Sequence, residues 1–231
     1  MTIICIPYAG ASSSIYWPWK TYKNHVCNII LYELPGRGVR FTDPYASEMQ
    51  EVVNEIVDII CNLPQNEDYV LFGHSMGGAI IFQSAQTIKI KKLRDPTHLF
   101  ISGRNAPNHV NESKGIYNLD DESFIIELKK YAGKIDHILA NEELKNIYLS
   151  VLRADFRLID TFKYDPNIIL DCDITVLHGQ FDETMQGKPH EWKYYTNGNC
   201  TSISFKGNHF FLVDYLPQIM DYILLKLSDY K

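Results

Sequence analysis

The sequence predicts an α/β fold in which a mostly parallel central sheet carries helices on both faces. Six short apolar runs rich in β-branched residues recur along the chain. Such near-continuous runs are typical of strands buried on both faces of a parallel sheet. Amphipathic helical patterns separate the runs, as expected for right-handed βαβ crossovers.

The elements follow one another in a regular order. The predicted strands are Thr2–Ile6, Cys27–Tyr32, Tyr69–Phe72, Thr97–Ser102, Asp173–Leu177 and Cys200–Phe205. The clearest helix is Glu48–Cys61, whose apolar residues recur at helical spacing. Ser47 and Gln50 are candidates for a capping box at its start. The last predicted helix is Phe210–Leu227.

One stretch interrupts the alternation of strands and helices. About 70 residues between Ser102 and Asp173 contain no convincing strand but two helical patterns, Asp121–Ala132 and Glu142–Phe162. Asn141 is a candidate cap for the second helix. Active sites of such sheets lie at the carboxyl ends of the strands, so residues 107–162 are expected to form a helical lid. The alternative is an ordinary helical layer on the sheet.

Length and composition fit one large globular domain or two small ones. The chain has 231 residues, 45% of them hydrophobic, which excludes general disorder. We expect one domain, with a core of 1–106 and 163–231 and the lid inserted between them. The net charge of −6 argues against nucleic acid as the main partner.

Compartment and cofactor needs are inferred from what the sequence lacks. No apolar run is long enough to cross a membrane, and the amino-terminal residues lack a signal-peptide pattern. The five cysteines are scattered and show no metal-ligand spacing. We therefore expect a cytoplasmic protein with reduced thiols, no metal site, no cofactor and no membrane partner.

The strongest motif is Gly73-His74-Ser75-Met76-Gly77, a G-x-S-x-G run between a strand and a helix. The serine of such a turn projects from the end of the sheet, and flanking glycines remove side chains that would clash there. Ser75 is therefore the candidate nucleophile. The alternative is a glycine-rich turn without catalytic function.

A serine nucleophile needs a histidine base and a carboxylate that orients it. Among eight histidines, His209 follows the last predicted strand and precedes the last helix, where the base is expected. Asp182 follows the preceding strand and is the candidate acid, with Glu183 as its competitor. The sequence thus places three complementary groups at one edge of the sheet.

The same edge should also supply N–H donors for a developing oxyanion. One donor is expected at Met76, the residue after the nucleophile. The second should come from the small, glycine-bearing loop Pro7–Ser14, which differs from the HGGG loop of many lipases and esterases.

Several motifs together resemble the type II thioesterases, the stand-alone editing thioesterases of nonribosomal peptide synthases (NRPS) and polyketide synthases (PKS). The matching segments occur in order over nearly the whole chain. They are Cys5–Gly10 with Trp17–Trp19, Leu34–Arg37 with Arg40–Phe41, Leu71–Gly77, His98–Arg104 with Ala106–Pro107, Leu152–Phe156 and Gly207–Leu212. This resemblance implies an α/β-hydrolase fold.

The resemblance also implies a function. By position it implies Ser75 as nucleophile, Asp182 as acid, His209 as base, and the Ala9 and Met76 amides as oxyanion donors. The implied reaction is hydrolysis of acyl thioesters on the 4′-phosphopantetheine arm of carrier proteins, which removes aberrant acyl groups from an NRPS or PKS. A monomer is expected.

The sequence departs from the family pattern at two places. Ala11 stands where a second glycine is common, and Ala132-Gly133-Lys134-Ile135 replaces a Gly-Gly-x-Pro-like turn of the lid. The second departure affects the expected lid geometry and acyl-chain preference.

The sequence indicates the residues that dock the carrier or line the pocket less specifically than it indicates the catalytic groups. Because carrier domains are acidic, basic docking faces are expected. The candidate clusters are Lys89, Lys91, Lys92 and Arg94, and Lys129, Lys130 and Lys134. Aromatic candidates for an acyl or pantetheine path are Tyr8, Trp17, Trp19, Phe156 and Phe162, with core packing as the alternative.

Two other functions remain open from the sequence. A carboxylesterase or lipase-like enzyme would use the same groups on oxoesters. A catalytically inactive α/β-hydrolase would serve as a binding module. Hydrolysis of carrier thioesters compared with short oxoesters distinguishes the three.

Overall fold

Six parallel strands form the central sheet of the computed structural model, which describes residues 1–21, 27–109, 114–132, 141–228 and 230, with 130–132 as backbone alone. The strand order is β2-β1-β3-β4-β5-β6. The strands are β1 (Thr2–Ile6), β2 (Asn28–Leu31), β3 (Tyr69–His74), β4 (His98–Ser102), β5 (Asp173–Gly179) and β6 (Cys200–Phe205). The predicted α/β fold with a parallel central sheet is confirmed.

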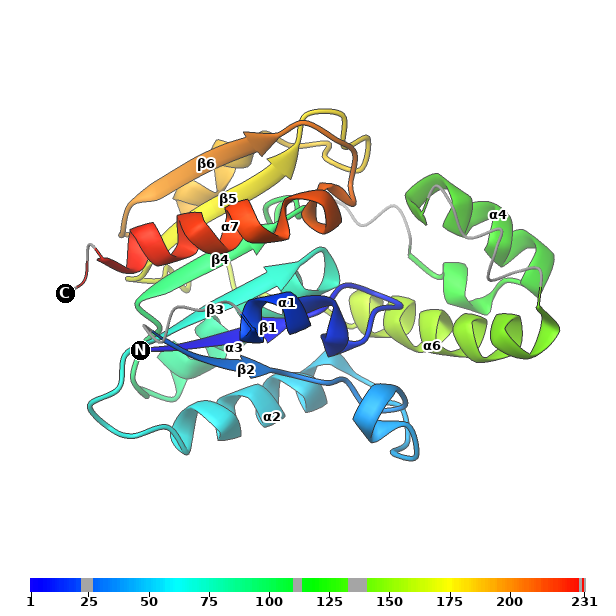
Figure 1. Cartoon of the computed structure of the whole chain (residues 1–231), viewed down its shortest axis with the longest axis horizontal. Helices are drawn as coiled ribbons and strands as arrows, with labels where there is room; N and C mark the ends of the chain where they lie inside the picture. The colour runs from blue at the N-terminus through cyan, green and yellow to red at the C-terminus, as the bar shows by residue number, and fades with distance from the viewer. Residues whose placement is uncertain (22–26, 110–113, 133–140, 229, 231) are drawn as a thin grey trace.

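Helices cover both faces of this sheet (Figure 1). On one face α2 (Met49–Cys61) and α3 (Met76–Ile90) share an apolar core with Ile4 and Leu71. On the other face α1 (Trp17–Lys20) and α7 (Phe211–Ser228) pack with the neighbouring residues Ile3 and Val70. Alternate strand residues thus enter opposite cores, which explains the continuously apolar strand sequences.

Two further helices lie beyond the carboxyl ends of the strands, on the side toward which the arrowheads in Figure 1 point. They are α4 (Asp121–Ala132) and α6 (Glu142–Asp160). The Asn141 side chain accepts a hydrogen bond from Leu144 N at 3.0 Å, which confirms the predicted cap. The short 3₁₀ helices are η1 (Ser13–Tyr16), η2 (Gly38–Arg40), η3 (Ile116–Asn118) and η4 (Pro189–Tyr195).

The predicted capping box of α2 is wrong. Glu48 is the N-cap residue, and Ser47 instead contacts the Glu51 side chain with both its backbone N–H and its hydroxyl. The first helical amide, Met49 N, donates to Thr161 Oγ1 at 2.8 Å. A residue 112 positions away in the chain therefore satisfies the first amide of the helix.

The last helix also differs from its predicted form. It starts at Phe211 and has non-helical dihedral angles at Tyr215 (φ −119°, ψ 16°), two residues before Pro217. Proline has no backbone N–H to donate, and its ring crowds the preceding turn. The helix therefore kinks there. None of the helices in the described ranges is both long and apolar enough to cross a membrane.

Candidate active site

Ser75 occupies a strained turn between β3 and α3. Its dihedral angles are φ 53° and ψ −111°, in a region that non-glycine residues rarely adopt. The backbone N–H of Ser75 donates to Ser102 O on β4 at 2.7 Å, which fixes the turn to the sheet. Strain of this kind is retained where the surroundings enforce it, and it is concentrated at functional sites.

The glycines of the motif are required by close contacts. A Cβ at Gly73 would lie 2.2 Å from Gly77 O, and a Cβ at Gly77 would lie 2.3 Å from Ile6 O at the end of β1. Both contacts are with backbone, which cannot move aside easily. The turn therefore lies directly against β1 and the loop that follows it, residues 7–12, called the β1 loop below.

Two backbone amides lie at this junction, and both are predicted oxyanion donors. Among the described residues, neither Ala9 N in the β1 loop nor Met76 N at the start of α3 donates a hydrogen bond. Met76 is in the first turn of α3, where the helix dipole favours negative charge. The two amides predicted as oxyanion donors thus have no acceptor in the part of the chain that the structure describes.

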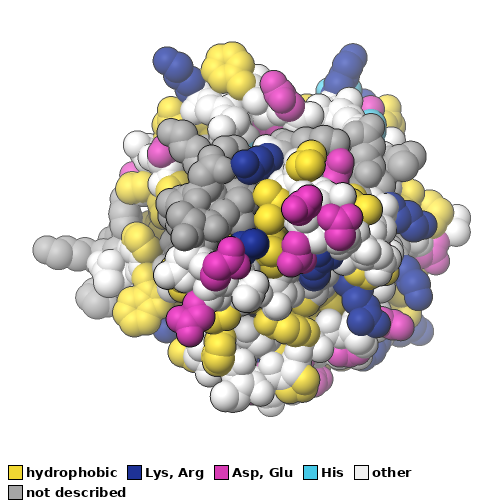
Figure 2. All heavy atoms as spheres, turned by 90° about the vertical axis from the view of Figure 1, so that its right-hand side faces the viewer, with side chains coloured by type: hydrophobic (Ala, Val, Ile, Leu, Met, Phe, Trp, Pro, Cys, Tyr) yellow, Lys and Arg dark blue, Asp and Glu magenta, His cyan; other side chains and the backbone are white. Residues whose placement is uncertain are grey.

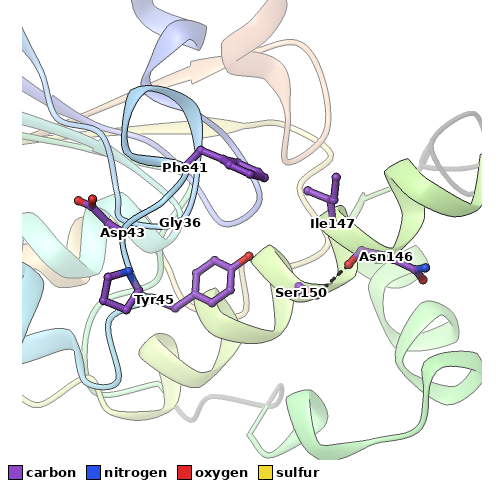
Figure 3. A pocket seen from close by; sticks show the side chains of 8 residues that line it. Gly36, Phe41, Asp43, Tyr45, Asn146, Ile147 and Ser150 are labelled. Atoms are coloured by element: carbon purple, nitrogen blue, oxygen red, sulfur yellow. Dashed lines mark hydrogen bonds between the residues drawn. The ribbon is translucent and has the colours of Figure 1, made fainter.

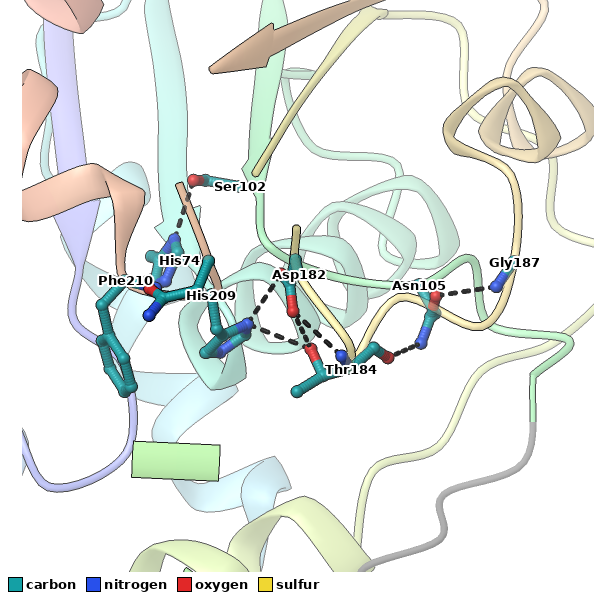
Figure 4. Close-up of polar contacts among 9 residues, drawn as sticks. His74, Ser102, Asn105, Asp182, Thr184, Gly187, His209 and Phe210 are labelled. Atoms are coloured by element: carbon teal, nitrogen blue, oxygen red, sulfur yellow. Dashed lines mark hydrogen bonds and ion pairs between the residues drawn. The ribbon is translucent and has the colours of Figure 1, made fainter. Parts of the chain in front are cut away.

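His209 and Asp182 come together at the ends of β6 and β5. His209 Nδ1 lies 2.9 Å from Asp182 Oδ2, and both residues are buried (Figure 4). Glu183, the competing acid, is exposed. Thr184 donates its hydroxyl to Asp182 Oδ1 at 2.7 Å and its backbone N–H to the same oxygen at 3.0 Å. Both carboxylate oxygens therefore have partners.

These contacts keep Asp182 ionised. Burial raises the pKa of Asp182, but the hydrogen bonds from His209 and Thr184 outweigh it and hold the pKa below its ordinary value of 3.8. A carboxylate at this position accepts the Nδ1–H of His209 and leaves Nε2 without the ring proton. The imidazole is thereby prepared to act as a base at Nε2.

A second imidazole, His74, borders the first. Its ring centre is 5.1 Å from that of His209, and its Nδ1 lies 2.8 Å from Ser102 Oγ. Burial, with the nearby His209, lowers the pKa of His74 well below its ordinary value, so its ring stays neutral. Gly103, with φ 57°, lies between the rings, because a Cβ there would be 2.7 Å from His74 Cε1 and 3.3 Å from His209 Cε1.

The candidate residues meet at one edge of four adjacent strands. His209 lies against His74, which precedes Ser75 in the chain, and against Gly103, which follows Ser102. Ser75 in turn donates its backbone N–H to Ser102 O. Within the described ranges, the Ser75 hydroxyl makes no hydrogen bond to His209. The structure thus joins the candidate base and the candidate acid directly, and it places the candidate nucleophile beside them through intervening residues.

Sequence reasoning missed the residues that hold the acid loop. Asn105 donates to Thr184 O at 2.8 Å and accepts from Gly187 N at 3.1 Å, so it connects the loop after β4 to the loop after β5 (Figure 4). The only available signal was the spacing Asp182-x-Thr184, since a hydroxyl two residues after an aspartate favours a local turn. Asn105 carries no such local signal.

The aromatic candidates divide between core and site. Trp19 is core, stacked on Tyr16, and Phe156 packs against Phe124. Trp17 is exposed. Tyr8 lies beside the candidate site: its ring packs edge-on against that of His74, with the ring centres 5.5 Å apart. Phe162 lies 5.6 Å from the Arg104 guanidinium, beside α3.

The first basic cluster is less suited to docking than the sequence indicated. Lys89 pairs with Asp171, and Arg94 donates to backbone carbonyls of 64 and 65. Over its 15 residues, α3 rises about 1.5 Å per residue and so ends about 22 Å from Met76, toward the opposite edge of the sheet. In the second cluster, Lys134 lies outside the described residues and Lys130 is described as backbone only.

The face that carries α4 and α6 is mixed in charge. Acidic side chains gather near its middle, whereas Lys and Arg lie mostly toward its margins (Figure 2). A separate groove of about 350 Å³ lies between residues 36–45 and α6, with Phe41 and Ile147 on its opposite sides (Figure 3). Neither the groove lining nor any described cluster of His, Cys, Asp and Glu offers a metal site.

Comparisons with known proteins identify the family. A family model for the thioesterase domain matches residues 1–227. The gramicidin S biosynthesis protein GrsT of Aneurinibacillus migulanus is 31% identical over 231 residues, covering 98% of this chain and 89% of the relative. The crystal structure of ClbQ from the colibactin NRPS/PKS pathway superposes with a TM-score of 0.89 at 26% identity, covering 99% and 97% of the two chains.

A second solved structure carries the more specific description. The type II thioesterase BorB from the borrelidin biosynthetic cluster superposes with a TM-score of 0.84 at 28% identity, covering 96% of this chain and 91% of the other. These matches confirm the resemblance that the motifs indicated. The strained G-x-S-x-G turn beside a buried His–Asp pair agrees with these matches. The chain belongs to the thioesterase family.

Proposed function

We propose that the protein is a type II thioesterase that hydrolyses acyl thioesters on the 4′-phosphopantetheine arm of carrier proteins in an NRPS or PKS. The observation that carries this proposal is the 2.9 Å contact between His209 and Asp182 beside the strained turn of Ser75. Membership in the thioesterase family supports a thioester as the bond that is cleaved. The biosynthetic pathways of the relatives support an acyl group on a carrier protein as the substrate.

The first half of the reaction would acylate the serine. Ser75 Oγ attacks the thioester carbonyl carbon while His209 Nε2 takes the hydroxyl proton. The carbonyl oxygen becomes an oxyanion, for which the N–H groups of Ala9 and Met76 are the proposed donors. The C–S bond then breaks, His209 returns the proton to sulfur, and the pantetheine thiol leaves.

The second half would release the acid. A water molecule gives a proton to His209 Nε2 and attacks the Ser75 ester through the same oxyanion site. Collapse of this intermediate restores the serine hydroxyl with the proton from His209. Throughout, Asp182 keeps the imidazole oriented and stabilises its positive charge. These steps use only side chains, backbone amides and water, so we expect activity without an added metal or cofactor.

The organisation of the chain follows from this proposal. The pantetheine arm belongs to a separate carrier protein, and residues 107–162, which include α4 and α6, would act as the lid over the acyl chain. Removal of aberrant acyl groups is the proposed biological role. We also propose that the protein works as a monomer in the cytoplasm, where the synthase substrates are made.

Substrate comparison tests the proposal. The wild type and Ser75→Ala should be assayed with an acyl group on a carrier protein and with the same acyl group as a nitrophenyl oxoester. We expect preference for the carrier thioester and a loss of about 10⁴–10⁶ in kcat for Ser75→Ala. Preference for the oxoester would favour the carboxylesterase alternative. Binding of the acyl carrier without turnover by the wild type would favour the inactive binding module.

A further inference from the structure

A buried carboxylate on α6 reaches the β1 loop. Asp155 is completely buried and binds both terminal nitrogens of Arg37, with Nη1 to Oδ2 at 2.6 Å and Nη2 to Oδ1 at 2.5 Å. Oδ2 also accepts the backbone N–H of Gly10 at 2.7 Å. A buried charge is tolerated when it is paired and its lone pairs are used. Asp155 therefore joins three segments that are far apart in the sequence.

Gly10 is the residue through which this contact acts on the loop. It has φ 82°, and a Cβ there would lie 2.8 Å from Leu152 Cδ2 of α6, so the loop backbone lies directly against this helix. Because Gly10 follows Ala9 in the chain, the bond to Asp155 restricts the peptide next to the proposed oxyanion donor. Arg37 Nη1 adds a bond to Ala11 O at 3.3 Å.

The far end of the loop is held by another residue. Glu33 accepts from the Ser12 hydroxyl at 2.7 Å and from Ser13 N at 2.9 Å. Within the loop itself, the described backbone provides a single hydrogen bond, from Ala11 N to Tyr8 O at 3.0 Å. One backbone bond thus closes the turn that contains Ala9, and Asp155 and Arg37 hold this turn in place against the rest of the protein.

We propose that Asp155, held by Arg37, is a positioning residue that fixes the Ala9 amide at the point where the substrate oxyanion forms. This inference rests on the proposed function, since it takes Ala9 as an oxyanion donor. Asp155 belongs to α6, within the segment 107–162 that we assign to the lid. The lid segment would then help to build the catalytic site as well as cover it.

The decisive variant is Asp155→Asn, which keeps the shape of the side chain but removes its charge. Its amide group offers only one acceptor oxygen to Gly10 and Arg37. A displaced oxyanion donor weakens binding of the transition state and leaves binding of the ground state unchanged. We expect kcat to fall by about 10- to 100-fold while KM stays within about twofold.

Two inhibitors separate positioning from a general loss of structure. A trifluoromethyl ketone analogue of the acyl-pantetheine forms an oxyanion on Ser75, whereas an amide analogue, with nitrogen in place of sulfur, binds as a ground state. In Asp155→Asn, affinity for the ketone should fall in parallel with kcat, and affinity for the amide should stay within about twofold. Equal losses for both analogues would show a merely structural role and overturn the proposal.

A matched control is Leu158→Ala, which removes a buried side chain of the same helix outside this hydrogen-bond network. It should lower thermal stability but leave the ratio of the two affinities unchanged. If Asp155→Asn does not fold, Arg37→Lys gives the decisive reading, because lysine keeps the charge but cannot bind both oxygens. We then expect the same selective loss, of smaller size.

The proposal fails if a folded Asp155→Asn, or Arg37→Lys in its place, keeps both kcat and ketone affinity within about threefold of the wild type. Failure of the proposed function gives a different result, because the wild type itself would then prefer the oxoester or bind the acyl carrier without turning it over. The first outcome is read from Asp155→Asn or Arg37→Lys, and the second from the wild type.

Discussion

The hydroxyl of Thr184 lies 3.0 Å from Nδ1 of His209 while donating its own proton to Asp182 at 2.7 Å. Nδ1 therefore faces two acceptors, Asp182 Oδ2 and Thr184 Oγ1, with the ring proton between them. Two side chains of the loop after β5 thus fix the orientation of the His209 imidazole. Thr184 supports the orientation of both the acid and the base.

Replacing Thr184 by valine should impair this support. The Asp182 carboxylate loses a hydroxyl donor and is freer to rotate away from His209, so we expect kcat to fall about tenfold with a small change in KM. Thr184→Ser keeps the hydroxyl and should retain most of the activity. Steady-state kinetics of both variants test this, and equal losses in the two would contradict the assigned role of the hydroxyl.

Asp182→Asn should separate the catalytic carboxylate from its exposed neighbour. The amide favours the wrong histidine tautomer, so we expect a fall of about 10⁴ in kcat, whereas Glu183→Gln should remain near the wild type. The reverse ranking of these two variants would assign the acid to Glu183.

The same pair gives a prediction about stability and pH. Hydrogen bonds to Asp182 place its folded-state pKa below the ordinary value of 3.8, so the folded protein binds the proton less readily than the unfolded chain. This contribution to stability is present above that ordinary value and is lost as the pH falls through the lower folded-state pKa. Urea unfolding of the wild type and Asp182→Asn should show a stability difference that is constant from about pH 5 to 7 and shrinks below about pH 4. A difference that grows on acidification would contradict this.

Two glycines with positive φ angles provide a test of the spacing within the site. Gly103 (φ 57°) lies between His74 and His209, whereas a Cβ at Gly115 (φ 79°) would meet nothing within 4 Å. Alanine at either position costs about 1–2 kcal/mol in backbone strain. Only Gly103→Ala should also displace the imidazoles, and we expect kcat to fall at least about tenfold. Thermal unfolding should show a similar loss of stability in both variants, and steady-state kinetics should show a loss of kcat in Gly103→Ala alone.

The position of the first basic cluster predicts that it does not dock the carrier. Lys91 and Lys92 are exposed beyond the end of α3, far from Met76. Charge reversal at both residues should leave kcat/KM for an acyl carrier within about twofold at low salt, where electrostatic steering is strongest. A large loss with the carrier, and none with a small acyl-pantetheine, would instead place the docking face there.

Local sequence patterns were sufficient for much of the fold. The β-branched runs, the helical spacing of residues 48–61 and the Asn141 cap report on contacts within a few residues, and each appears in the structure. The G-x-S-x-G turn could be predicted for the same reason, since its glycines meet backbone only a few residues away or on the adjacent strand. Chain order then led to His209 and Asp182, which the fold brings within hydrogen-bond distance.

Contacts across long sequence separations could not be predicted in this way. Arg37 and Asp155 are 118 residues apart, and the Met49 amide finds its cap at Thr161, 112 residues away. Nothing in the sequence near either partner specifies the other. These pairings arise only when α6 comes to lie against the end of the sheet, so the motif residues Arg37 and Asp155 had no assignable function until the structure joined them.

The central claim is that Ser75 carries the acyl group during turnover. Because a thiolate leaves readily, we expect deacylation to be slower than acylation, so that the acyl-enzyme accumulates. Rapid quench of the wild type with an acyl carrier, followed by intact-protein mass spectrometry and peptide mapping, measures this directly. We predict a burst of thiol release approaching one per enzyme, with the acyl mass on Ser75 and no adduct in Ser75→Ala. Steady turnover without any acyl adduct on Ser75 would contradict it.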